Sequence, residues 1–134
     1  MNLSTLWRFV LVAMAGLGAA AQAATPAELL AKYSAQTGAA PSPERGQRFF
    51  TTKFGRNFDW SCSTCHGAVP TKAGKDEVTE KPIQPMAPAF NAARFSDAAK
   101  VEYMFRLNCK DVVGRECTAA EKADLLSWLL TLKP

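Results

Sequence analysis

The order of apolar and polar residues predicts two helices after residue 24. The first follows the capping box Thr25-Pro26-Ala27-Glu28, in which threonine caps the helix and proline occupies its first position. Gly38 is expected to end this helix, because glycine commonly adopts the conformation that closes a helix. The second helix begins after Ser42 and includes the aromatic pair Phe49-Phe50.

Two further helices are predicted toward the C-terminus. One is expected from Asp97 to about Asn108. The residues expected on one face of this helix are Val101, Met104, Phe105 and Asn108. A second capping box, Thr118-Ala119-Ala120-Glu121, opens the last helix. Its apolar face has i, i+3, i+4, i+7 spacing and consists of Leu125, Trp128, Leu129 and Leu132.

The segment between the second and third of these helices is rich in proline. Pro82, Pro85 and Pro88 remove backbone donors and disfavour helix, so this segment is expected to be extended. No stretch of the chain shows the alternation typical of a strand. The pattern therefore predicts an all-α fold.

The N-terminal segment has the pattern of an export signal. Arg8 precedes an apolar run, and Ala21-Gln22-Ala23 supplies a small-residue cleavage site. An uncleaved membrane anchor is the alternative, but the run is short for a membrane span. The sequence predicts a signal peptide over residues 1–23, one domain over residues 24–134, a periplasmic location and no membrane span after cleavage.

Charge and cysteine content narrow the function classes. The 134-residue chain has 16 basic and 12 acidic residues, a net charge of +4. Cleavage would remove Arg8 and leave 15 basic against 12 acidic residues, or +3. This mild charge, without a basic run among aromatics, argues against nucleic-acid binding. All four cysteines follow the predicted cleavage site, in a compartment that permits disulfides.

The pentapeptide Cys62-Ser63-Thr64-Cys65-His66 is the motif with the clearest chemistry. Cys-x-x-Cys-His is typical of covalent haem attachment, in which Cys62 and Cys65 add to the haem vinyl groups and His66 binds the iron. A redox Cys-x-x-Cys would be expected in a βαβ context, and a zinc site would need a second close cysteine pair. The helical pattern and the compartment favour one haem c.

The second axial position of the iron has two candidate ligands. His66 is the only histidine, which excludes a bis-histidine haem. Met86, after Pro85, is the default candidate, because a thioether suits an electron carrier, although it follows His66 by only 20 residues (66 to 86). Asn108 follows by 42 residues (66 to 108), nearer the usual separation. Each residue also has an explanation without iron: Met86 as a methionine of the core, and Asn108 as an asparagine at the end of a helix.

Four segments together resemble the SHP-type (sphaeroides haem protein) cytochromes c. These segments are Arg94-Phe95-Ser96-Asp97, Asn108-Cys109, Val113-Gly114-Arg115-Glu116-Cys117-Thr118 and residues 121–129. The resemblance extends over nearly all of the chain from about Thr25 onward. The Asn-Cys…Cys arrangement is far more specific than the haem motif, which all c-type cytochromes share.

The resemblance implies a class I cytochrome c-like helical fold and assigns residue roles. It places His66 as the proximal and Asn108 as the distal iron ligand, and it implies a Cys109–Cys117 disulfide. Met86 stays open as the alternative ligand on the evidence of the residues alone. The resemblance further implies that Asn108 is released on reduction, so that oxygen, NO or CO can bind. The implied redox partner is a dihaem cytochrome c, with a membrane cytochrome b upstream.

Two other functions remain open from the sequence. One is a conventional electron carrier with a permanent His66/Met86 haem. The other is a small reductase of oxygen, NO or peroxide, for which the chain offers no distal histidine and only Arg94, Arg106 and Lys110 to assist. An electron-transfer or gas-binding protein that is not an enzyme is the expectation.

Overall fold

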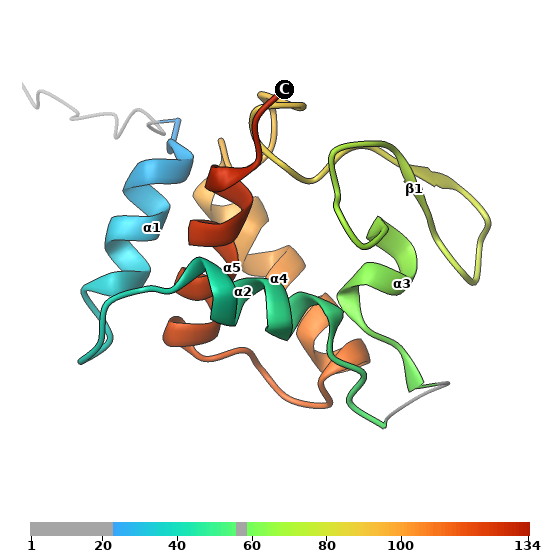
Figure 1. Cartoon of the computed structure of the whole chain (residues 1–134), viewed down its shortest axis with the longest axis horizontal. Coiled ribbons are helices and arrows are strands. Elements are labelled where there is room, and N and C mark those ends of the chain that lie inside the picture. The colour runs from blue at the N-terminus through green and yellow to red at the C-terminus, as the bar shows by residue number, and fades with distance from the viewer. Residues whose placement is uncertain (1–22, 56–58) are drawn as a thin grey trace, which may run out of the picture.

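The computed structural model describes residues 23–55 and 59–134 (Figure 1). The elements in chain order are α1 (Pro26–Ser34), α2 (Pro43–Thr51), α3 (Cys62–His66), β1 (Gly74–Lys75), β2 (Pro82–Ile83), α4 (Ala98–Val112) and α5 (Ala119–Thr131). The predicted signal peptide, except for Ala23, lies outside the described residues. None of the described helices has both the length and the apolar character needed to cross a membrane.

The predicted helix starts are confirmed, because each cap residue acts locally. The Thr25 hydroxyl accepts the Glu28 N–H at 3.1 Å, and the Glu28 carboxylate accepts the Thr25 N–H at 2.7 Å. Ser42 caps α2 and Asp97 caps α4 through their side-chain oxygens. Thr118 forms the same reciprocal box at α5. These contacts satisfy N–H groups that have no partner within their helix.

Two predicted helix ends were wrong. Helix α1 ends at Ser34, before Gly38, because Gln36 and Thr37 donate to the carbonyls of Tyr33 and Ser34 and form a separate turn. Helix α4 continues to Val112, because Gly114, at φ 82°, is the residue that closes it by donating to the Cys109 carbonyl at 3.0 Å.

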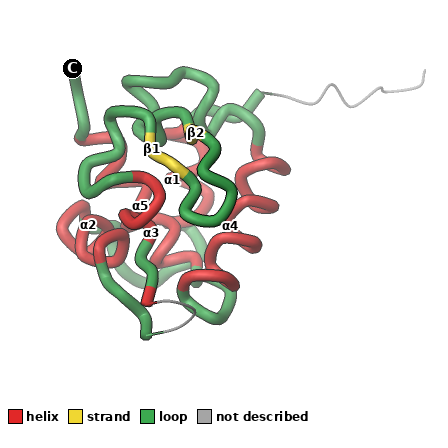
Figure 2. Tube along the Cα trace, turned by 90° about the vertical axis from the view of Figure 1, so that its right-hand side faces the viewer, coloured by secondary structure: helices red, strands yellow, loops and turns green. Residues whose placement is uncertain are grey.

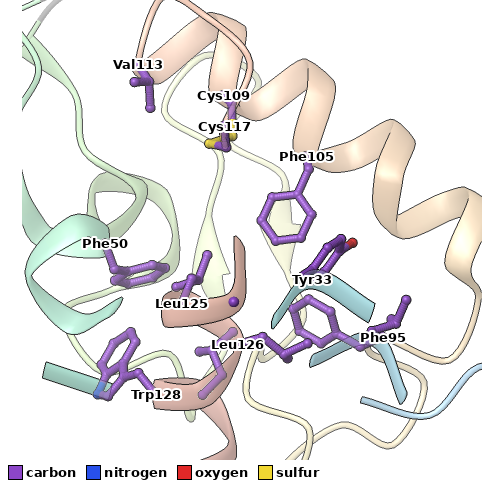
Figure 3. Close-up of a cluster of buried hydrophobic side chains, with 13 residues drawn as sticks. Tyr33, Phe50, Phe95, Phe105, Cys109, Val113, Cys117, Leu125, Leu126 and Trp128 are labelled. Carbon is purple, nitrogen blue, oxygen red and sulfur yellow. A yellow bond between two sulfur atoms is a disulfide. The ribbon is translucent and has the colours of Figure 1, made fainter. Parts of the chain in front are cut away.

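The core forms where α1 and α2 pack against α5 (Figure 3). Gly46 of α2 lies against the backbone of Asp124, and a Cβ atom at Gly46 would overlap the Asp124 carbonyl. The absence of a side chain at Gly46 thus allows α2 and α5 to cross closely. Phe50, with no exposed surface, packs against Trp128 of α5 at a centroid distance of 5.0 Å.

Between α3 and α4 the chain is extended over residues 82–86, as Pro82 and Pro85 predict. Pro88 instead lies in a turn, in which Phe90 and Asn91 donate to the Ala87 carbonyl, so the prediction was wrong there. Gly74 pairs with Ile83 and Lys75 with Pro82, which forms a two-stranded antiparallel hairpin beside α3 (Figure 2). This short hairpin is an addition to an otherwise helical fold. The chain then returns over the haem-motif segment, where Met86 and Ala87 both donate to the Pro70 carbonyl at 3.1 Å.

Candidate haem site

A cavity of about 860 Å³ lies between α3, α4 and the extended segment. This volume is in the range that proteins use for cofactors and small molecules. Apolar side chains from several elements line it, among them Phe49, Ile83, Val101, Phe105, Val112 and Leu125. Figure 2 shows α4 along one side of the molecule, with α3 below the hairpin.

Helix α3 supplies the residues of the haem motif. Ser61 caps it, donating its N–H to the Thr64 hydroxyl at 3.0 Å, and Gly67, at φ 78°, ends it. The three-residue spacing puts Cys62 and Cys65 on one side of this single turn, and both line the cavity as free thiols. The structure therefore brings the two cysteines of the motif to the same wall as His66.

His66 faces the cavity from a largely apolar environment. Its ring lies 6.2 Å from the Phe50 ring, between centroids. Burial lowers the pKa of His66 to about 4, and the positive charge of Arg94 adds to this effect. The imidazole is therefore neutral near pH 7, which is the form that coordinates metals.

Helix α4 forms the wall that the one-face spacing predicts. Val101, Met104, Phe105 and Asn108 all line the cavity. Phe105 is buried, whereas Asn108 is exposed where it lines the cavity. Asn108 lies inside the helix, with Val112 one turn further on, so that its explanation as a helix-terminal residue was wrong.

Met86 reaches the same cavity from the extended segment. It is partly buried and packs against the hydrophobic core. Both candidate sixth ligands thus lie at the cavity that contains His66, Met86 on a loop and Asn108 on a helix.

The Cys109–Cys117 disulfide is present. It joins α4 to the residue just before Thr118, the cap of α5, across a Cα–Cα distance of 5.7 Å. Cys109 is 6% and Cys117 7% exposed, so the bridge belongs to the core (Figure 3). It directly follows Asn108 and fixes the chain on one side of that residue.

Two features of the site were not predicted from the sequence. Gly74 of β1 lies against the backbone of Cys65 and His66, which makes room for the hairpin behind α3. Arg94, which the sequence offered only as an assisting residue, lines the cavity and donates to the carbonyls of Pro85 at 2.9 Å and Gln84 at 2.7 Å. These contacts join residues 9 or 10 positions apart in different elements or loops, and only the arginine carried a signal.

Known proteins resemble this chain in sequence and in fold. A family profile described as a domain of unknown function, DUF1924, matches residues 36–129. The cytochrome c-type protein SHP of Cereibacter sphaeroides is 49% identical over 107 residues, which cover 78% of this chain and 82% of SHP. The chain belongs to the SHP-like c-type cytochromes of the DUF1924 family.

Other relatives support the same family assignment for this SHP-like cytochrome. Cytochrome c'' of Methylophilus methylotrophus is 42% identical over 94 residues, which cover 69% of the chain and 65% of cytochrome c''. The structure of oxidized SHP, an oxygen-binding cytochrome c, matches with a TM-score of 0.77 at 45% identity, over 82% of the chain and 99% of SHP. The crystal structure of oxidized cytochrome c'' from the same organism matches with a TM-score of 0.74 at 36% identity, over 81% of the chain and 95% of cytochrome c''.

The helical cytochrome c fold and the cofactor follow from this membership. The SHP-like cytochrome carries one covalently bound haem c, and it groups with electron-transfer and gas-binding haem proteins rather than with enzymes. The residues present fit this group, because two free thiols and a neutral imidazole line one largely apolar cavity. Bound haem supplies one-electron redox chemistry and, at an open axial position, affinity for diatomic gases.

Proposed function

We propose that this SHP-like cytochrome is a periplasmic one-electron redox protein in which Asn108 controls access of a diatomic gas to the haem. In this proposal Cys62 and Cys65 hold the haem through thioethers and His66 is the proximal ligand. Asn108 binds the iron on the other side in the ferric state. Reduction releases Asn108 and leaves room for oxygen, NO or CO.

The observation that carries the proposal is the placement of Asn108. It lies on the cavity face of α4, one turn beyond the buried Phe105 and directly before the disulfide-bonded Cys109. His66 lies at the same cavity on α3, and the chain has no second histidine to compete. An amide on a helix can bind through its side chain and leave by rotating that side chain, while the helix backbone stays in place.

The chemistry of an amide suits a releasable ligand. The carbonyl oxygen of Asn108 is a hard donor, which favours ferric iron over the softer ferrous iron. Adding an electron therefore weakens the attachment of Asn108, whereas a methionine thioether would be held more firmly in the ferrous state. Reduction would thus open the iron site if Asn108 is the ligand, and would keep it closed if Met86 is the ligand.

The relatives support the same behaviour. SHP is described as an oxygen-binding cytochrome c, and the solution structure of cytochrome c'' is described in terms of haem-ligand detachment. The latter matches this chain with a TM-score of 0.71 at 36% identity. Gas binding and ligand release are thus known among proteins of this fold and sequence.

In this proposal the location rests on the features of an exported protein, and the redox partner on the family resemblance. The signal-like N-terminus, the disulfide and covalent haem attachment support the periplasm. The electron donor in this proposal is another cytochrome, a dihaem cytochrome c fed by a membrane cytochrome b. The mild net charge supplies little long-range steering for this encounter.

The ligand role of Asn108 is tested by Asn108→Ala in the holoprotein, with Met86→Leu as the matched control from the same cavity. We expect Asn108→Ala to convert the low-spin ferric absorption spectrum to a high-spin or water-ligated one, and Met86→Leu to leave it unchanged. The reverse pattern would show that Met86 is the ligand.

A conventional His66/Met86 electron carrier is the second candidate. Its support is that Met86 lines the cavity on a loop after Pro85. This function predicts an iron closed in both oxidation states. Its support is weaker, because Met86 also packs against the hydrophobic core, where a methionine needs no iron to explain it.

A further inference from the structure

Helix α4, which carries Asn108, is attached to the protein mainly through individual side chains. Among the described helices the close pairs are α2 with α5, α1 with α5 and α2 with α3, and α4 is in none of them. Its attachments include the buried Phe105 ring, the Cys109–Cys117 disulfide and the ion pairs of Glu102. The position of Asn108 therefore depends on these side chains.

Lys122 of α5 forms the more enclosed of the two ion pairs of Glu102. Its side chain is only 17% exposed, and its Nζ atom lies 2.7 Å from the Glu102 Oε2 atom of α4. The same Nζ lies 5.4 Å from the centroid of the Tyr33 ring and 5.4 Å from that of the Phe105 ring. These two rings meet edge to face at 6.0 Å (Figure 3). Lys122 thus contacts α1 and α4 at once.

The surrounding cations keep the Glu102 carboxylate charged. Burial opposes ionisation of Glu102, but its hydrogen bonds to Lys122 and Lys32 and the positive charge of Lys122 outweigh burial and hold the pKa of Glu102 below its ordinary value. A largely buried ammonium also gains from aromatic faces more than an exposed one does. Removing one partner of such a pair leaves the other charge without compensation.

Lys32 of α1 offers an internal comparison. It binds the other oxygen of Glu102 at a longer distance, 3.4 Å, and its side chain is 51% exposed. It lies 5.9 Å from the Tyr33 ring. Exposed ion pairs of this kind contribute little, because water screens them. The same carboxylate therefore has one enclosed and one solvent-side cation.

The enclosed contact lies close to Asn108 along α4. Glu102 precedes Asn108 by six residues, or about 9 Å at the rise of an α-helix, and Phe105 precedes it by three. The disulfide at Cys109 holds the helix on the other side. The cation of Lys122 and the disulfide thus bracket the segment from which Asn108 extends into the cavity.

We propose that Lys122 is a positioning residue for Asn108: by holding Glu102 and Phe105 against α1 and α5, it sets the rotation and height of α4 at which Asn108 binds the ferric iron. This inference rests on the proposed function. It implies that ligand release is a movement of the Asn108 side chain and not a displacement of α4. Weakening this anchor should weaken ferric ligation by Asn108 without touching the haem attachment.

The test compares holoprotein variants by their affinity for added imidazole in the ferric state, because imidazole must displace Asn108. Couplings carried by such contacts change binding by about 2- to 30-fold. We expect Lys122→Met, which keeps an apolar stem of similar length, to bind imidazole tighter by that factor and to raise the high-spin ferric fraction. Lys122→Arg should restore both values to within twofold of the wild type, and Lys32→Met should leave both unchanged.

The outcomes separate this inference from the function on which it rests. If Asn108→Ala leaves the ferric spectrum unchanged, the ligand role fails, and the positioning role fails with it. If Asn108→Ala changes the spectrum while Lys122→Met binds imidazole as Lys32→Met does, the positioning role is overturned and the function stands. Should Lys122→Met not fold, Glu102→Gln decides, since it removes the same charge pair and should show the same tighter binding.

Discussion

Gly74 lies directly against the backbone carbonyl of Cys65, so closely that a Cβ atom at Gly74 would overlap that oxygen. This contact joins the hairpin to the helix that holds the haem motif. It fixes α3 against the hairpin, although the two residues belong to different elements and neither is charged. The support of the haem-binding turn is therefore a matter of backbone packing.

Gly74→Ala should disturb this turn. The added methyl group cannot fit unless α3 or the hairpin moves, and overpacking of this kind costs about 1–3 kcal/mol. We expect a lower free energy of unfolding in denaturant and a smaller haem-loaded fraction on expression. Gly38→Ala is the matched control, because a Cβ atom at Gly38 meets nothing within 4 Å. Equal stability of the two variants would contradict the supporting role of Gly74.

Phe50→Ala should be strongly destabilising. Phe50 is fully buried and lies between the rings of His66 and Trp128, at centroid distances of 6.2 and 5.0 Å. Truncation leaves a cavity and should cost about 3–5 kcal/mol in unfolding experiments. Val78→Ala, at a residue that is 72% exposed, should change stability by less than about 0.5 kcal/mol. A loss below about 1 kcal/mol for Phe50→Ala would show that this contact is not part of a tightly packed core.

Removing the disulfide should affect both stability and the iron. The bridge closes a short loop, and the chain-entropy model assigns such a loop about 2–3 kcal/mol. The Cys109→Ser, Cys117→Ser double variant should unfold at correspondingly lower denaturant. Because Cys109 adjoins Asn108, we also expect altered affinity for CO in the ferrous state. If CO affinity is unchanged while stability falls, the bridge is only structural.

The free energy of unfolding should fall in acid, partly because Glu121 becomes protonated. Hydrogen bonds from Arg115, at 2.6 and 2.8 Å, and from Thr118 hold the pKa of Glu121 below its ordinary value of 4.5. The folded state thus binds fewer protons than the unfolded state, so the stabilisation is complete above pH 4.5 and is lost as the pH falls through the lowered pKa. Glu121→Gln should flatten this part of the pH–stability curve, whereas Glu77→Gln, at an exposed residue, should not. Parallel curves for Glu121→Gln and the wild type would contradict this assignment.

The helix starts and the haem motif were predictable because their causes are local. A cap such as Thr118 bonds to a residue three positions away, and the spacing of Cys62, Cys65 and His66 follows from the haem that they bind. The end of α4 was missed because Gly114 closes it, beyond the polar residue at which the apolar face stops.

The contacts that complete the site were not predictable, because they join residues 9 or 10 positions apart through loops whose course no helix or cap pattern fixes. Nothing near Gly74 in the sequence indicates that Cys65 lies against it, and the carbonyls of Gln84 and Pro85 that Arg94 binds have no side-chain signature. The spacing of the residues also did not decide whether Met86 or Asn108 is the second ligand of the iron. Family resemblance, and not the pattern of residues, favoured Asn108.

Release of Asn108 from the iron on reduction can be followed in the absorption spectrum of the holoprotein in three states: ferric, ferrous, and ferrous with CO. We predict a low-spin ferric spectrum without the methionine–iron charge-transfer band, a high-spin ferrous spectrum, and immediate binding of CO. A methionine band in the ferric form, followed by a low-spin ferrous form that is inert to CO, would contradict this prediction and would identify a His66/Met86 electron carrier.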